Sequence, residues 1–118
     1  MESFSAGDIY SFEGRKSDPS PQIIILGKEP FLDTTAVHVQ IIGIELQISD
    51  GQTLTKIGHV PVCEESLRNS VIDYLGKANV PDDELEGIKV WKEAKGGIYT
   101  VSLKEIVNII ERTLHEEE

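Results

Sequence analysis

The chain contains 118 residues, of which 21 are acidic and 11 basic, and its formal net charge at pH 7 is −10. This charge disfavours contact with nucleic-acid phosphates, and no apolar run approaches the ~20 residues that span a bilayer. Hydrophobic content of 39% and a single cysteine, Cys63, are typical of a globular domain without disulfides. We therefore expect one domain over residues 1–118, in a bacterial cytoplasm, that binds neither nucleic acid nor membranes. Residues 116–118 are expected to form a frayed acidic tail.

The first half of the chain predicts short β-strands. The clearest is the β-branched run from Ile23 to Ile25, which lies between Pro21 and Gly27. Polar stretches that hold proline or aspartate separate the strands and predict loops. On this pattern we expect strands at 7–12, 22–27, 36–48 and 54–62, with loops at 14–21 and 28–34.

A glycine interrupts the longest of these predicted strands. Apolar residues alternate up to Ile41, and after Gly43 the alternation resumes with the opposite parity, which predicts a β-bulge or a sharp bend. The dipeptide Asp50-Gly51 then predicts a hairpin turn. Several short strands, one of them bent at a glycine, favour a small twisted sheet or an SH3-like barrel in the N-terminal half.

The second half of the chain predicts two amphipathic helices separated by a β-hairpin. Apolar residues recur at helical spacing over 64–77 and again over 103–115. Ser102 and Glu105 match a capping box at the start of the second helix. Residues 88–101 predict two short strands joined by a glycine turn. The fold class expected from the whole chain is therefore α+β.

The sequence contains no recognisable motif for catalysis, a metal or a cofactor. His59 and Cys63 lie four positions apart, but a nucleophilic pair needs direct contact and a third group that orients the imidazole. The histidines do not occur at zinc-ligand spacing, and Asp82-Asp83-Glu84 lacks the alternating ligands of a calcium loop. We therefore expect a non-enzymatic protein with no catalytic residue, metal or cofactor.

Acidic side chains and one tryptophan define a candidate binding surface. An acidic surface steers a protein toward a basic partner and raises the association rate. Trp91 either packs under the last helix or, if exposed, serves as an anchor, because tryptophan is enriched at binding hot spots. We therefore predict an inhibitor or immunity-type protein that neutralises a basic protein such as a nuclease toxin. The partner-binding residues on this hypothesis are Glu64, Glu65, Asp82, Asp83, Glu84, Glu86 and Trp91.

The opening of the chain resembles that of a known family. Residues 7–10 (GDIY), a polar loop and residues 21–26 (PQIIIL) resemble the start of MazF/PemK-type endoribonuclease toxins, over about the first fifth of the chain. The resemblance implies an SH3-like barrel and, as an alternative function, RNA cleavage. The family's Gly-x-Glu-Gln loop with its following catalytic arginine is absent, and residues 14–16 (GRK) stand in its place. A phage-type or secretion-type assembly subunit is a further alternative, and the oligomeric state is left open.

Overall fold

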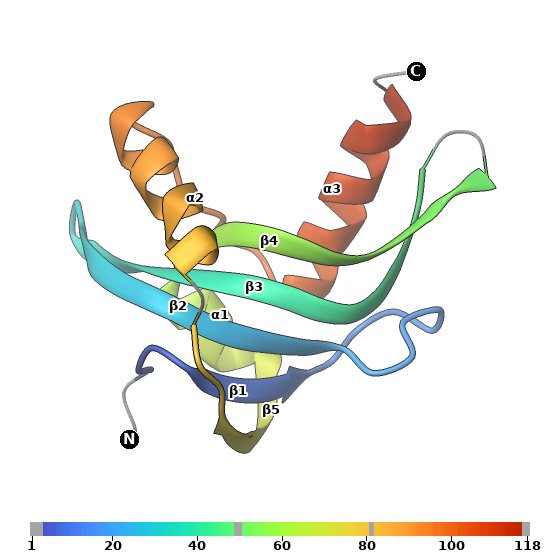
Figure 1. Ribbon diagram of the computed structural model, residues 1–118, viewed down its shortest axis with the longest axis horizontal. Coiled ribbons are helices and arrows are strands. Elements are labelled where there is room, and N and C mark those ends of the chain that lie inside the picture. The colour runs from blue at the N-terminus through green and yellow to red at the C-terminus, as the bar shows by residue number, and fades with distance from the viewer. Residues whose placement is uncertain (1–3, 49–50, 81, 117–118) are drawn as a thin grey trace.

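The computed structural model describes residues 4–48, 51–80 and 82–116, except for the side chains of residues 82–84 and 115–116. These residues form five strands and three helices (Figure 1). The predicted α+β class is confirmed. In chain order the elements are β1 (Asp8–Phe12), β2 (Gln22–Phe31), β3 (Thr34–Gln47), β4 (Thr53–Cys63), α1 (Glu64–Ser70), β5 (Val71–Lys77), α2 (Asp82–Glu93) and α3 (Leu103–Glu116).

The strands form one antiparallel sheet in the order β4-β3-β2-β1-β5. Strands β4 and β5 are its two edges, and within the described residues no pairing joins them. The sheet is therefore open, and the predicted SH3-like barrel is not confirmed. Helices cover both faces at β3, where Ala36 to Ile41 are all buried, so the apolar side chains leave water without closure of the sheet.

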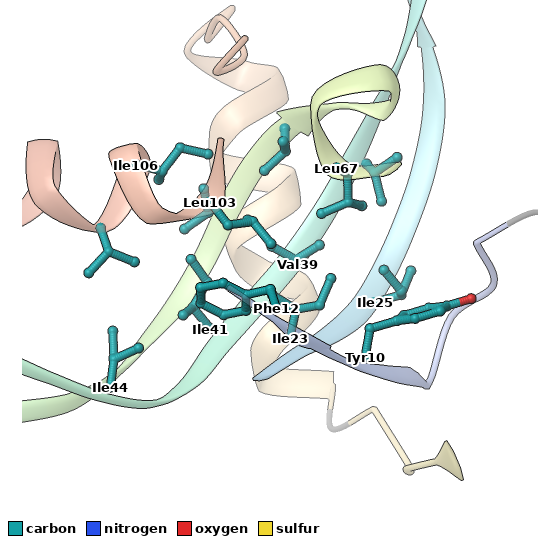
Figure 2. Close-up of a cluster of buried hydrophobic side chains, with 14 of the residues drawn as sticks. Tyr10, Phe12, Ile23, Ile25, Val39, Ile41, Ile44, Leu67, Leu103 and Ile106 are labelled. Atoms are coloured by element: carbon teal, nitrogen blue, oxygen red, sulfur yellow. The ribbon is translucent and has the colours of Figure 1, made fainter. Parts of the chain in front are cut away.

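The main hydrophobic core lies between one face of the sheet and helices α1 and α3 (Figure 2). Val39 and Ile41 of β3 point into it and are fully buried, as are Leu67 of α1 and Leu103 and Ile106 of α3. Each such side chain contributes about 1.5–3 kcal/mol relative to an exposed position. The apolar stripe predicted for residues 103–115 is therefore confirmed.

The start of α3 is capped as predicted. The backbone N–H of Glu105 donates a hydrogen bond to Ser102 Oγ at 3.2 Å, which satisfies one of the amides that lack an intrahelical acceptor. A second bond reaches this helix from α1, because the Leu103 N–H donates to Ser70 Oγ at 3.0 Å. The cap therefore joins α3 to the end of α1.

The glycine bend predicted in the third strand is also confirmed. Gly43 has φ 71°, and the β3–β4 register shifts between Ile42 and Leu46. The Ser20 N–H donates to the Gly43 carbonyl at 3.0 Å, and the Ser20 carbonyl occupies the space that a Cβ at position 43 would need. Of the predicted Asp50-Gly51 turn, Gly51 has φ 74°, and Asp50 lies outside the described residues.

The loop predicted at residues 28–34 is wrong. Strand β2 continues to Phe31 and β3 begins at Thr34, which is its direct partner, so only residues 32 and 33 turn. Pro30 is tolerated because β1 pairs only with the first residues of β2, at Gln22 to Ile24. The proline nitrogen, which cannot donate, therefore lacks a neighbouring strand on that side.

The helix predicted at residues 64–77 is correct only in its first half. Helix α1 ends at Ser70, whose Oγ donates to the Ser66 carbonyl at 2.8 Å, and the chain continues as β5. Residues 71–77 form a strand because they pair with the outer side of β1, where Tyr74 is the partner of Tyr10. The two rings meet edge to face at 5.5 Å.

The hairpin predicted at residues 88–101 is also wrong. Residues 82–93 form α2, which lies on the sheet face opposite to α1 and α3, and beyond it Tyr99 makes an isolated bridge to Val62. The helix ends at Glu93, and two residues later Lys95 has φ 54°. The Lys95 and Gly96 amides donate to the carbonyls of Lys92 and Trp91, which is the hydrogen-bond pattern of a Schellman motif.

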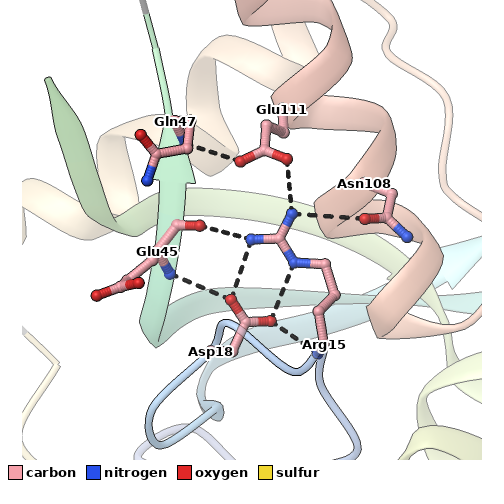
Figure 3. Close-up of polar contacts among 6 residues, drawn as sticks. All are labelled: Arg15, Asp18, Glu45, Gln47, Asn108 and Glu111. Atoms are coloured by element: carbon pink, nitrogen blue, oxygen red, sulfur yellow. Dashed lines mark hydrogen bonds and ion pairs between the residues drawn. The ribbon is translucent and has the colours of Figure 1, made fainter. Parts of the chain in front are cut away.

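An arginine ties the loop at residues 14–21 to the rest of the molecule (Figure 3). The Arg15 guanidinium pairs with Asp18 at 3.0 Å and with Glu111 of α3 at 2.8 Å. It also donates to the Glu45 carbonyl of β3 at 2.6 Å and to Asn108 at 3.4 Å. One side chain thus joins the loop, the sheet and the last helix.

Candidate functional site

Three polar side chains form a hydrogen-bonded chain across the sheet beneath α2. His38 Nε2 on β3 lies 2.9 Å from Glu29 Oε2 on β2, and His38 Nδ1 lies 2.7 Å from His59 Nε2 on β4. Lys92 Nζ on α2 lies 3.6 Å from Glu29 Oε1. We call Glu29, His38, His59, Trp91 and Lys92 the histidine cluster.

Irregularities in the sheet bring the two histidines together. In the β3–β4 register, Gly58 and His59 together face the single residue Gln40, so β4 has a bulge at this point. A bulge re-aims the side chain that it carries. On its other side His38 pairs with Gly27, which has no side chain to compete for the space.

Helix α2 covers the cluster through one narrow face. Gly87 lies directly on His59, since a Cβ at position 87 would come within 2.7 Å of the His59 Cβ. One turn later, Trp91 places its ring edge to face with His38 at 4.7 Å and beside Phe31 at 5.7 Å. Trp91 Nε1 donates to the Gly97 carbonyl at 2.8 Å, which holds the indole in place. The result is that His38 is only 1% exposed.

The hydrogen bonds fix the protons of the two neutral imidazoles. An ionised Glu29 carboxylate only accepts, so His38 carries its proton on Nε2 and presents Nδ1 as an acceptor. His59 must then donate from Nε2. His38 Nε2 and His59 Nε2 therefore act as donors, and His38 Nδ1 acts as an acceptor.

Burial keeps both histidines neutral. Desolvation lowers the pKa of His38, partly offset by the hydrogen bond and charge of Glu29. Desolvation and the neighbouring His38 together lower the pKa of His59 to about 4. His59 is therefore neutral at pH 7 and does not titrate near neutrality.

Cys63 lies apart from the histidine cluster, and no metal site is found among the described residues. Cys63 Sγ lies 3.6 Å from Thr34 Oγ1, and no contact joins it to His59. Both residues lie on β4, where four residues extend about 13 Å, so their side chains stay apart. No group of three or more His, Cys, Asp or Glu side chains in the described part of the chain is placed to hold a metal ion.

The structure distributes the predicted partner-binding residues over both faces of the sheet. Glu64 and Glu65 begin α1, and Glu64 is ion-paired with Arg68 at 3.3 Å. Glu86 is exposed on α2, on the opposite face, and Trp91 is half-buried in the histidine cluster. The side chains of Asp82, Asp83 and Glu84 lie outside the described residues, although their backbone belongs to α2.

Sequence reasoning missed the histidine cluster. A single histidine among apolar strand residues, as His38 is between Val37 and Val39, is a weak signal. Helix α2 covers the face of β3 that carries His38, and this burial would have strengthened the signal. The sequence predicted a hairpin in place of α2, so the burial was not expected. Glu29 was assigned to a loop, so nothing placed a carboxylate beside the histidine.

No protein family, curated protein or solved structure matches this chain. Among the described residues, no helix has the length and apolar character needed to cross a membrane.

Proposed function

We propose that this chain is a non-enzymatic binding protein of the inhibitor type, and that α2 is the helix that docks on a basic protein partner. The observation that carries this proposal is the outer face of α2. Leu85 and Val90 are 40% and 61% exposed, and Glu86, Lys89 and Glu93 are exposed on the same outer side of the helix. Glu86 and Glu93 are two turns apart and therefore lie one above the other on that face.

The way α2 is held supports this role. Its inner face, through Gly87, Ile88 and Trp91, packs on the sheet and fixes the helix in place. An amphipathic helix with apolar side chains at its flanks is a common recognition element, because it fits into a groove of a partner. The docking surface is thus rigid before binding, which reduces the entropy lost on association.

The charge of the chain supports a basic partner. The chain holds 21 acidic and 11 basic residues, which gives a net charge of −10. Three of these acids, Asp82, Asp83 and Glu84, directly precede Leu85 in α2. Negative charge near the start of a helix is favoured by the helix dipole and steers a basic partner toward this end.

The role of Arg15 argues against the alternative of MazF/PemK-type catalysis. Arg15 stands in the region that resembles that family, and its guanidinium is bound to Asp18, Glu111 and Glu45. A group so engaged lacks the donors that it would need for a phosphate. This observation favours binding over RNA cleavage.

The test compares two charge-reversed baits with the wild type in a lysate of the source cell. E86K/E93K alters the outer face of α2, and E13K/D73K makes the same change of charge at exposed positions elsewhere. We expect the wild type and E13K/D73K to retain one basic protein at low salt, and E86K/E93K to lose it. Retention of that protein by all three baits, or of no basic protein by any, would contradict the proposal.

A further inference from the structure

Helix α2 is the least firmly held of the three helices. Over residues 85–93 it contributes no fully buried side chain, and only Gly87, Ile88 and Trp91 are half-buried. Helices α1 and α3, by contrast, place fully buried leucine and isoleucine side chains in the main core. An element with few buried apolar contacts opens at a lower free energy than the whole protein unfolds. We therefore expect α2 to be the helix that separates first from the sheet.

Protonation of the histidine pair beneath α2 adds a proton at one defined atom. His38 Nε2 donates to Glu29, and the hydrogen bond between the two rings occupies His38 Nδ1 and His59 Nε2. His59 Nδ1 is the one ring nitrogen of the pair that has no hydrogen-bond partner among the described residues. Addition of a proton therefore creates an N–H group at His59 Nδ1, whichever ring holds the proton that lies between them.

This new N–H group lies against α2. A Cβ at Gly87 would come within 3.4 Å of His59 Nδ1 and within 2.7 Å of the His59 Cβ. Glycine has no side chain that could accept a hydrogen bond from the new group. Burial of a charged group without a partner is far more costly than burial of a neutral one, so water must reach this atom. Water gains the necessary room when α2 moves away from the sheet.

The charged groups that face the pair favour its neutral form while α2 is closed. Glu29 on β2 attracts positive charge to His38, and Lys92 on α2 opposes it. Lys92 Nζ also lies 3.6 Å from Glu29 Oε1 and so offsets part of the carboxylate charge. Among the described residues, no other charged side chain forms an ion pair or a hydrogen bond with either imidazole. Desolvation is the largest effect on both histidines, and it lowers the pKa of each.

We propose that α2 is an acid-released lid, which lifts from the sheet when His59 takes up a proton at Nδ1 while the strands and the other two helices stay in place. The main core lies on the other face of the sheet and includes no described side chain of α2. Movement of a half-buried helix exposes less apolar surface than opening of that core, so it is the route of lower free energy. This opening is a property of the chain alone, and it stands or falls separately from the docking role proposed for α2.

The chain beyond α2 provides a fixed point for this movement. The Tyr99 N–H donates to the Pro61 carbonyl at 3.0 Å, and the Tyr99 carbonyl accepts from the Cys63 N–H at 2.8 Å. Residue 99 is thus tied to β4. Residues 94–98 lie between the helix and this point, and a Cβ at Gly97 would meet no atom within 4 Å. These residues can therefore act as the hinge of the lid.

Amide hydrogen exchange of the wild type, corrected for the intrinsic effect of pH on exchange, tests the proposal. The pKa of His59 is about 4 in the closed form, and that of an exposed histidine is ~6.5. The equilibrium constant for opening should therefore rise about 50-fold between about pH 7 and about pH 4.5. Amides of residues 85–93 should lose protection by that factor, whereas residues 37–41 and 107–111 should keep theirs. Equal loss in all three segments, or unchanged protection of residues 85–93, would overturn the proposal.

The single tryptophan of the chain gives a second readout. Trp91 lies on α2 with its ring against His38, so its fluorescence should shift to longer wavelength when the lid opens in acid. H59Q cannot take up the proton, although its amide can still donate to His38 Nδ1. Its emission should therefore stay the same from about pH 7 to about pH 4.5, where His59 of the wild type takes up its proton. Circular dichroism at pH 7 checks that this variant is folded.

The matched control separates the histidine from the carboxylates of α2. E86Q/E93Q removes two exposed glutamates whose ordinary pKa, ~4.3, lies in the same range, and it should shift its emission as the wild type does. Loss of the shift in E86Q/E93Q would show that the glutamates open the lid and would overturn the proposal. A folded H59Q whose emission shifts as in the wild type would overturn it as well.

Discussion

His38 and His59 show how an interior polar chain can be satisfied in a small domain. Each buried imidazole nitrogen between Glu29 and His59 has a partner, and no buried side-chain nitrogen or oxygen in the described residues lacks one. Burial of an unpaired polar group costs about 1–3 kcal/mol, so the loss of any one of these side chains would leave a buried hydrogen-bond partner unsatisfied. The cluster therefore fixes the register of three strands with respect to α2.

The lowered pKa of His59 predicts a loss of stability in mild acid. The unfolded chain binds a proton near pH 6.5, whereas native His59 does so only near its pKa of about 4. Stability is therefore complete above about pH 6.5 and is lost as the pH falls toward about 4, by at most about 3 kcal/mol. Urea denaturation of the wild type across this range measures the slope.

One histidine variant separates this effect from general acid denaturation. H59Q should show a shallower slope than the wild type between pH 6.5 and about 4. The lowered pKa values of Asp8 and Asp18 act in more acidic solution, because those carboxylates lose their ion pairs only when protonated. An unchanged slope in H59Q would show that the cluster does not titrate as its burial implies.

At the level of elements, the C-terminal end of α2 depends on a lysine at a position where helices usually have glycine. Lys95 takes the left-handed conformation that ends the helix, a conformation that glycine adopts at little cost. The next residue cannot vary, because a Cβ at Gly96 would clash with the Trp91 ring. The end of α2 and the histidine cluster are therefore coupled through Trp91.

The strain at Lys95 predicts a stabilising substitution. K95G should raise the free energy of unfolding by about 0.5–1 kcal/mol, because glycine adopts the left-handed conformation without steric cost. K89G, at an exposed position inside the same helix, should lower it by about 1 kcal/mol. Thermal and urea denaturation measure both. A loss of stability in K95G would mean that its side chain contributes more than its backbone costs.

At the scale of the whole molecule, Arg15 joins parts that are far apart in the sequence. Asp18 is wholly buried, and burial alone would raise its pKa, but hydrogen bonds from Arg15 and from the Glu45 amide lower it. Glu111, the other partner of Arg15, also accepts from the Gln47 N–H at 2.7 Å. Removal of the guanidinium would leave the buried Asp18 without its charge partner and would break the ion pair between the loop and Glu111 of α3.

The Arg15 network predicts a large loss of stability. R15A should lower the free energy of unfolding by about 3 kcal/mol or more, because it leaves the buried Asp18 carboxylate without its charge partner. R112A, at an exposed position of α3, should change stability by no more than about 0.5 kcal/mol. Urea denaturation at neutral pH compares them. Equal effects of the two substitutions would show that the network does not hold the loop in place.

The elements that the sequence alone determined are those whose own residues decide their structure. Strand β2 has a β-branched run, α3 has an apolar stripe with a serine cap, and the bend at Gly43 needs a positive φ that few other residues adopt. Local propensity and periodicity agree at these places, so they were predicted correctly. The net charge, and with it the basic partner that we propose, is likewise a property of composition.

Only the tertiary structure decided the assignment of residues 71–77 and 82–93. Residues 71–77 carry apolar side chains at spacings that suit either a helix or a strand, and the vacant side of β1 selected the strand. Residues 82–93 became a helix that covers the second face of β3 and closes over His38. The histidine cluster could not be predicted because its members come from three strands and a helix, and contacts between distant segments leave no local periodicity.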